Sequence, residues 1–267
     1  MPRAVAACLV AVVSTACAIS RQQEVAMGAD FAAQIDAQLP LVRDAQVNQY
    51  VTALGNRLVG ATDSRGFTWS FTVVDSREVN AFAVPGGHIY VNRGLIERAA
   101  NMSQLAGVLA HEIGHVTERH SVEQMEQAQG ANIGVTLACT LTKACGSGAS
   151  QAAINLGGSA LFAKFSRSDE AEADAEAVAT TVKAGISPKV IPGMFRILLA
   201  DRQRDPGALD AFFATHPLAE DRITSTEALI AAYPAATLRG LPTDASAFQS
   251  IKRRLLSLPA PPKQSGG

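Results

Sequence analysis

A His-Glu-x-x-His pattern lies inside the apolar run Val108-Leu109-Ala110-His111-Glu112-Ile113-Gly114-His115-Val116. On a helix, His111 and His115 share one face because they are one turn apart, and together they can bind one zinc ion. Glu112 follows His111 by about 100° of rotation, which directs its carboxylate toward a water on the metal. Zinc acidifies such a water and polarises a carbonyl, and the glutamate accepts the proton. The pattern predicts a site for one Zn²⁺ with Glu112 as general base.

The residues around this pattern predict a buried helix. Two histidines and a glutamate could instead lie on the surface of an amphipathic helix, but the flanking residues are large and apolar or small, which favours close packing. Asn101 and Gln104 resemble a capping box that begins the helix, and we expect it to continue through Glu118, Arg119 and His120. His120 would then point away from the ligand face. The longer pattern, with Gly three and His six residues after His115, would need them where Glu118 and Ser121 stand, so the third ligand must come from elsewhere.

A later acidic segment, Ser166-Arg167-Ser168-Asp169-Glu170-Ala171-Glu172-Ala173-Asp174, offers that ligand. On a helix Glu170 and Asp174 share a face, and Glu172 points away. Glu170 can supply an oxygen ligand, and Asp174 can hydrogen-bond a ligand histidine. A solvated acidic helix face is the alternative, and the spacing leaves Glu172 or Glu176 open as the ligand.

Two further histidines need assignment. His216, in Thr215-His216-Pro217 ahead of Arg222, can serve as a transition-state donor, as a fourth ligand that blocks water, or merely as a turn histidine before proline. The sequence leaves these alternatives open. His88 follows a turn, and we predict a surface or turn position for it rather than a role as ligand.

The segment between the first helices and the histidine motif predicts a small sheet. Residues 67–74 alternate apolar and polar side chains, as in a half-buried strand. Pro85-Gly86-Gly87 separates two short extended runs and predicts a hairpin, in which proline favours an edge strand. An edge formed by Asn80, Ala81, Phe82 and Ala83 can pair with an extended peptide substrate. An ordinary sheet margin is an equal alternative.

Composition and periodicity predict one mainly helical α+β domain over residues 22–258. Apolar residues recur at helical spacing in residues 22–39, 44–59 and 248–258, and 48% of the chain is hydrophobic. Residues 259–267 contain proline, glycine and serine, which predicts a disordered tail. A net charge of −1 gives no basic field, so we expect no nucleic-acid partner.

The N-terminus predicts export. Arg3 precedes a short apolar run that ends in small residues around Cys17, as in a signal peptide over residues 1–18. Cleavage can fall before Ile19, or before Cys17, which would then be lipidated; we favour the lipoprotein, although the residue three before the cysteine is not the usual leucine. A first core helix is the remaining alternative. We expect a bacterial periplasmic protein. The lipid on Cys17 would be its only contact with a membrane, the outer membrane.

Cys139 and Cys145 remain as a pair in the mature chain. In an oxidising periplasm they can form a disulfide. Two free, buried thiols are an almost equal alternative, because sequence does not supply the Cα separation. The surrounding residues 130–158 are too polar and too interrupted by glycine for a membrane span, and we expect a mobile loop or loosely packed helices near the site.

Together these motifs resemble the HtpX, Oma and CAAX-prenyl-protease family of zinc metallopeptidases, peptidase family M48 of the gluzincins. The resemblance is carried, in the family's order, by Asn80-Ala81-Phe82-Ala83 with Pro85-Gly86-Gly87, His111 to His115, Ser166-Arg167 with Glu170 and Ala173-Asp174, and Thr215-His216-Pro217 with Arg222. It implies a gluzincin-like fold in which an edge strand flanks the zinc helix.

The same resemblance implies a role for each site residue. His111, His115 and Glu170 would bind zinc, with Glu112 as general base. Asp174 would hydrogen-bond a ligand histidine without binding the metal. His216 would lie over the metal as a switch or oxyanion helper, and Arg222 would anchor its loop. Gln104 is a departure, because relatives usually carry an acidic residue there.

The combined prediction is a zinc metalloendopeptidase acting on unfolded or misassembled envelope polypeptides. Without membrane spans or a repeat domain, the chain resembles the small periplasmic members of the family. The alternatives are a chaperone or assembly factor with structural zinc, and a non-proteolytic metal-binding lipoprotein; Glu112 argues against both. The sequence does not indicate the natural substrate, the cleavage preference or the oligomeric state.

Overall fold

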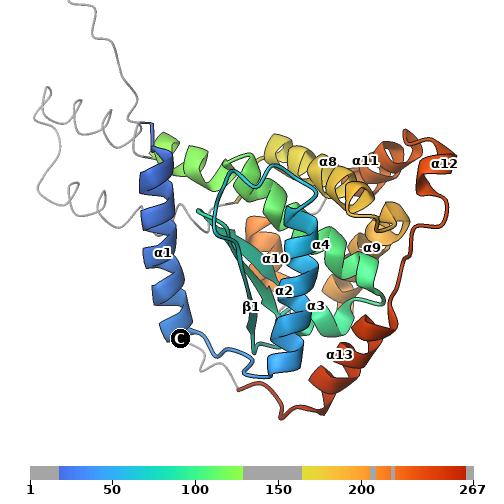
Figure 1. Ribbon diagram of the computed structural model, residues 1–267, viewed down its shortest axis with the longest axis horizontal. Helices are drawn as coiled ribbons and strands as arrows, with labels where there is room; N and C mark the ends of the chain where they lie inside the picture. Colours follow the sequence, from blue (N-terminus) through green and yellow to red (C-terminus); the bar gives the residue numbers. More distant parts are fainter. Residues whose placement is uncertain (1–17, 129–163, 205–208, 218–219, 263–267) are drawn as a thin grey trace, which may run out of the picture.

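The computed structural model describes residues 18–128, 164–204, 209–217 and 220–262 (Figure 1). Residues 1–17, which include Cys17 and most of the predicted signal peptide, lie outside the described residues, as do Cys139, Cys145 and residues 263–267. The elements, in chain order, are α1 (Arg21–Gln38), α2 (Ala45–Val59), β1 (Ser70–Val74), β2 (Ala81–Val84), β3 (His88–Asn92), α3 (Arg93–Arg98), α4 (Met102–Thr117), α8 (Arg167–Lys183), the 3-10 turn η1 (Pro188–Val190), α9 (Ile191–Arg204), α10 (Asp210–Thr215), α11 (Glu220–Ala231), α12 (Ala235–Leu238) and α13 (Ser246–Ser257).

Three strands form one sheet in the order β1-β3-β2. β1 runs parallel to β3, and β2 runs antiparallel to β3 with Phe82 opposite Tyr90. Gly86 and Gly87 turn the chain between β2 and β3 with φ angles of 82° and 101°, which glycine adopts without steric cost. The predicted hairpin is confirmed, and so is the edge position, because among the described strands β2 pairs only with β3.

Helices cover both faces of the sheet. Successive side chains of a strand point to opposite faces, so each face contributes apolar side chains to a different helix contact. Phe71 and Ile89 pack into the main core with residues of α2 and α4. On the other face, Tyr90 packs against α1, which lies along the sheet (Figure 1). The α+β, mainly helical class is confirmed. In the described part of the chain, no helix combines the length and apolarity that crossing a bilayer requires.

The predicted helices at both ends of the domain are present. α1 begins after Ser20, whose hydroxyl accepts the Gln23 N–H, and α2 begins after Asp44, whose carboxylate accepts two backbone N–H groups. α13 (red) packs beside α2 (blue) although the two are far apart in sequence (Figure 1). The fully buried ring of Phe248 lies in this contact, close to Tyr50.

The histidine-bearing helix α4 lies in the middle of the molecule, and all its residues are buried, as predicted. Asn101 caps it by accepting the Gln104 N–H at 3.1 Å. The predicted capping box is only half formed, because the Gln104 side chain accepts the N–H of Ala100 and not that of Asn101. One orphan donor at the start of α4, the Gln104 N–H, is therefore satisfied by the cap, and the second bond holds the residue that precedes the cap.

α4 ends at Thr117, and the prediction of one helix through Glu118, Arg119 and His120 is wrong. Arg119 adopts a left-handed conformation with φ of 63°, and a separate helical segment occupies residues 120–128. The Arg119 guanidinium donates to the buried Glu24 carboxylate at 3.0 Å and to the Ile19 carbonyl at 2.6 Å. These bonds stabilise a backbone turn that a non-glycine residue rarely adopts.

Candidate metal centre

Four buried side chains converge between α4 and α8: His111, His115, Glu170 and His216 each place one potential ligand atom within 4.8 Å of the others. The two Nε2 atoms of His111 and His115 are 3.0 Å apart. The Glu170 carboxylate oxygens lie 3.6 Å from His111 Nε2 and 3.7 Å from His115 Nε2. Ligands arranged tetrahedrally about 2.0–2.1 Å from zinc are about 3.4 Å apart, so the group fits a zinc ion.

α8 presents its carboxylates as the helical spacing predicts. The helix begins with a reciprocal capping box between Ser166 and Asp169. Glu170 and Asp174 point inward and are 1% and 5% exposed. Gly114 of α4 lets the two helices approach, because a Cβ atom there would lie 3.2 Å from the Ala173 Cα. This close contact brings Glu170 to the two histidines.

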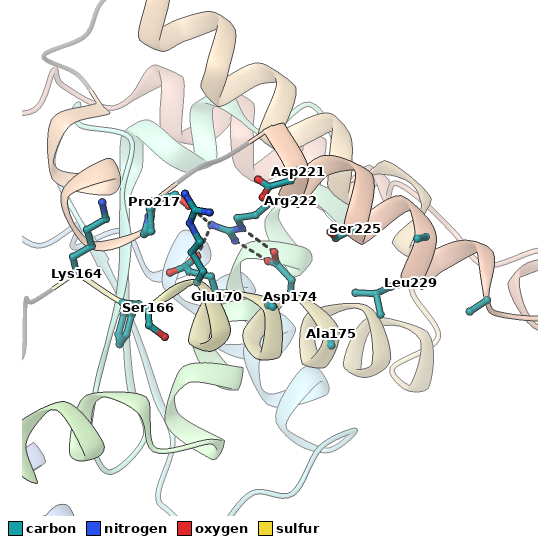
Figure 2. Close-up of a pocket in the computed structure, with 15 residues that line it drawn as sticks. Lys164, Ser166, Glu170, Asp174, Ala175, Pro217, Asp221, Arg222, Ser225 and Leu229 are labelled. Atoms are coloured by element: carbon teal, nitrogen blue, oxygen red, sulfur yellow. Dashed lines mark hydrogen bonds and ion pairs between the residues drawn. The ribbon is translucent and has the colours of Figure 1, made fainter. Parts of the chain in front are cut away.

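Arg222 connects α11 to the site, as Figure 2 shows. Its guanidinium donates to both carboxylate oxygens of Asp174, at 2.8 and 2.7 Å, and also pairs with Glu170. Asp174 in turn lies 3.0 Å from Nδ1 of His111. Burial opposes ionisation of Asp174, but the adjacent His111 ring and the hydrogen-bonded Arg222 guanidinium outweigh it and lower the pKa of the carboxyl. An ionised Asp174 orients the His111 ring so that Nε2 faces the ligand group.

The charge inside the site is not balanced by protein groups alone. Three buried carboxylates, Glu112, Glu170 and Asp174, face one guanidinium. Burial, together with the neighbouring cationic groups, lowers the pKa of His115 well below its ordinary value, so this imidazole is neutral. Both carboxylate oxygens of Glu112 are buried without a hydrogen-bond partner among the described residues. A divalent cation would offset the excess negative charge, which burial otherwise makes costly.

His216 belongs to the group and is not a solvent-exposed turn residue. Its Nδ1 lies 2.9 Å from Glu170 and its Nε2 3.6 Å from Glu112. Phe212 stacks against its ring with centroids 5.2 Å apart. Burial lowers the pKa of His216, but the Glu112 and Glu170 carboxylates outweigh that effect and raise it. His216 is thus placed to act either as a ligand or as a hydrogen-bond donor.

Other candidates from the sequence lie elsewhere. His88 hydrogen-bonds Ser70 on the sheet, at 2.9 Å. Glu176 accepts hydrogen bonds from Thr62 and Thr180. The Glu172 side chain is 63% exposed. None of the three belongs to the converging group among the described residues.

Sequence reasoning missed two residues that contact His115. The Phe165 ring stacks on the imidazole, with centroids 3.9 Å apart and planes 20° apart. The His120 Nδ1 lies 2.9 Å from the His115 Nδ1. Helical spacing placed His120 on the wrong face, and no motif revealed the left-handed residue that reorients it. Phe165 adjoins the Ser166-Arg167 motif, which was its only available signal.

A cavity of about 900 Å³ lies between α8 and α11 and reaches Glu170, Asp174 and Arg222 (Figure 2). Its walls are otherwise lined mostly by small and apolar side chains, among them Phe165, Ala171, Ala175, Ala228 and Leu229. The site is therefore continuous with a space large enough for the side chains of a ligand.

A buried His-Glu-x-x-His helix combined with a glutamate from a second helix defines the gluzincin class of metallopeptidases. The pattern of peptidase family M48 matches residues 45–230, and the chain belongs to this family. The family recognised in the sequence is thereby confirmed.

Relatives of known name support the assignment. The chain is 34% identical to the β-barrel assembly-enhancing protease of Yersinia pestis and 33% identical to that of Escherichia coli, over 79% and 77% of this chain. It is 30% identical, over 67% of its length, to the mitochondrial metalloendopeptidase OMA1 of Schizosaccharomyces pombe. The aligned regions cover 44%, 43% and 51% of these relatives, so the chain spans about half of their length.

Proposed function

We propose that this chain is a zinc-dependent metalloendopeptidase. The observation that carries the proposal is the convergence of His111, His115 and Glu170, with Glu112 beside them in the same buried site. The three converging residues would hold one Zn²⁺. Family membership supports the same chemistry.

The residues of the chain divide the work of hydrolysis. Zinc, when bound, supplies Lewis-acid polarisation of the scissile carbonyl and acidifies a water molecule. Glu112 would accept the proton of the attacking water on its carboxylate and pass it to the leaving amine. Asp174 holds the His111 ring, and Arg222 pairs with both Asp174 and Glu170 and keeps them in place.

His216 governs access to the site in this proposal. If His216 joined His111, His115 and Glu170, four protein residues would hold the zinc and would leave no place for the attacking water. Such a site would be latent until substrate arrives. His216→Ala tests this role by peptide cleavage. Higher cleavage supports an inhibitory ligand, whereas unchanged or lower cleavage contradicts a purely inhibitory role and, if lower, assigns His216 as a transition-state donor.

The substrates are proposed to be extended polypeptides. A peptide would add to the β2 edge at Asn80, Ala81, Phe82 and Ala83, and the cavity between α8 and α11 would accept its side chains. Because two relatives are named for β-barrel assembly, unfolded or misassembled cell-envelope proteins are the proposed class.

The same proposal places the chain in the bacterial periplasm, with residues 22–258 as one peptidase domain. Cys17 would carry a lipid anchor to the outer membrane, and Cys139 and Cys145 would form a disulfide. Mass spectrometry of the mature protein, with and without reductant, measures both modifications. A mature N-terminus at Ile19 would exclude the anchor.

The decisive experiment compares the mature protein with Glu112→Gln in zinc content and in casein degradation. One zinc per chain in both proteins, with cleavage by the first alone, supports the proposal, because glutamine keeps the volume but cannot accept the proton. Cleavage by Glu112→Gln would contradict the assigned general base. Absence of zinc from both proteins would overturn the proposal.

A chaperone or assembly factor with structural zinc is the second candidate, and the position of His216 among the potential ligands favours it. It predicts one zinc and no cleavage by the wild type or by His216→Ala. Its assembly activity would also survive Glu112→Gln. Cleavage by His216→Ala would eliminate this candidate.

A further inference from the structure

A buried histidine outside the proposed ligand set lies directly behind one of its members. His120 is 3% exposed, and its Nδ1 lies 2.9 Å from Nδ1 of His115. Its other nitrogen, Nε2, lies 3.3 Å from Oε2 of Glu172, whose side chain is largely exposed. These contacts form a continuous path from the His115 ring to a carboxylate at the surface.

Only one arrangement of protons satisfies this path when His115 binds a metal. His115 turns Nε2 toward His111 and Glu170, so Nε2 must be bare to act as a ligand, and the proton resides on Nδ1. The Nδ1–H can then donate to Nδ1 of His120, which must be bare. His120 consequently carries its proton on Nε2 and donates it to Glu172.

We propose that His120 and Glu172 are positioning residues that hold His115 in its metal-binding tautomer and orientation. The inference rests on the proposed zinc site and deepens it. Asp174 lies 3.0 Å from Nδ1 of His111, and His120 contacts the corresponding nitrogen, Nδ1, of His115. Partners of this kind raise the basicity of ligand histidines and orient their rings.

The fold places His120 by an unusual turn. Residues five apart on a continuous helix are separated by about 140° of rotation, so an unbroken α4 would point His120 away from His115. The left-handed Arg119 interrupts the helix and brings the two rings to a centroid distance of 5.0 Å. Arg119 is itself held by Glu24 of α1. Phe165, stacked on His115, restricts the ring further.

The test measures the zinc dissociation constant of the full chain by competition with a chromogenic chelator. His120→Phe keeps the ring volume but removes the acceptor, and we expect its dissociation constant to rise by about 10- to 100-fold. His120→Asn can present an amide oxygen near the position of Nδ1 and should recover most of that loss. Val122→Ala, a buried change in the same helical segment, is the control; it should lower stability while leaving zinc affinity unchanged.

Two readouts separate positioning from a structural role. The visible absorption of the Co²⁺-substituted protein reports ligand geometry, and it should change in His120→Phe but not in Val122→Ala. Long-range ¹H–¹⁵N spectra of the zinc-loaded wild type should show His120 protonated on Nε2. The double variant His120→Phe, Glu172→Ala should bind zinc no more weakly than His120→Phe alone, because Glu172 acts through His120.

Contrary results distinguish a failure of this inference from a failure of the proposed function. Zinc binding by the wild type with unchanged affinity in His120→Phe would overturn this inference and leave the proposed function intact. His120 protonated on Nδ1, or a double variant that binds zinc more weakly than His120→Phe, would do the same. A wild-type chain that binds no zinc would overturn the proposed function and this inference together.

Discussion

The pairing of Arg222 with Asp174 provides a sharp test of the buried charges. Arg222→Met retains much of the side-chain volume but leaves Asp174 and Glu170 without their guanidinium partner. Arg222 is 8% exposed and Asp174 5% exposed, so water cannot replace that partner efficiently. Removing one member of a buried ion pair costs about 3–5 kcal/mol. For a domain of this size the corresponding fall in Tm is about 6–20 °C.

The assay is urea unfolding of the metal-free protein, followed by circular dichroism. Asp174→Asn and the double variant Arg222→Met, Asp174→Asn complete a cycle. The double variant should lose less stability than the sum of the single variants, by about 1–3 kcal/mol, because it no longer buries an unpaired Asp174. Arg196→Met removes an exposed ion pair with Glu227 and should cost less than about 1 kcal/mol.

Two results would refute the reasoning. One is additivity within about 0.5 kcal/mol, which would mean that the two side chains do not interact energetically in the folded state. The other is an Arg222→Met variant as stable as Arg196→Met, which would mean that the site is hydrated and its charges are screened.

Three other predictions concern helix packing, turn packing and pH. Gly114→Val should weaken zinc binding and lower the unfolding free energy by about 1–3 kcal/mol, because its side chain would press on Ala173 and separate α4 from α8; unchanged zinc affinity would contradict this. Gly28→Ala should lower the Tm measured by calorimetry, since the added Cβ would lie 1.9 Å from the Pro85 carbonyl oxygen. A Tm equal to that of the wild type would show that α1 does not contact the turn between β2 and β3 this closely. Because the pKa of His115 is lowered in the folded state, the unfolded chain binds more protons below about pH 6.5. The metal-free wild type should therefore lose stability relative to His115→Gln as the pH falls below that value, and parallel urea-derived profiles would exclude the lowered pKa.

Local patterns were sufficient for much of the architecture and for half of the site. The spacing of His111 and His115 places them on one helical face, and the same rule pairs Glu170 with Asp174, because neighbouring turns of a helix are fixed by backbone geometry. Pro85-Gly86-Gly87 predicted the hairpin for a similar reason: the preferences of proline and glycine restrict the backbone locally.

Tertiary structure decided which distant groups meet. The approach of Ala173 to Gly114 selects Glu170 over Glu172 and Glu176, and the insertion of His216 beside Glu112 and Glu170 excludes its interpretation as a surface turn residue. No periodic pattern encodes these contacts, because they depend on how separate helices pack.

His120 shows the difference most clearly. A continuous apolar and amphipathic pattern predicts an uninterrupted helix, and in that helix His120 has no connection with the site. One residue, Arg119, adopts the left-handed conformation, and Glu24 and the Ile19 carbonyl, about a hundred positions earlier, bind its side chain. The motif specifies the chemistry of the ligands through local geometry, whereas the partners that orient them depend on long-range contacts that stabilise a locally unfavourable turn.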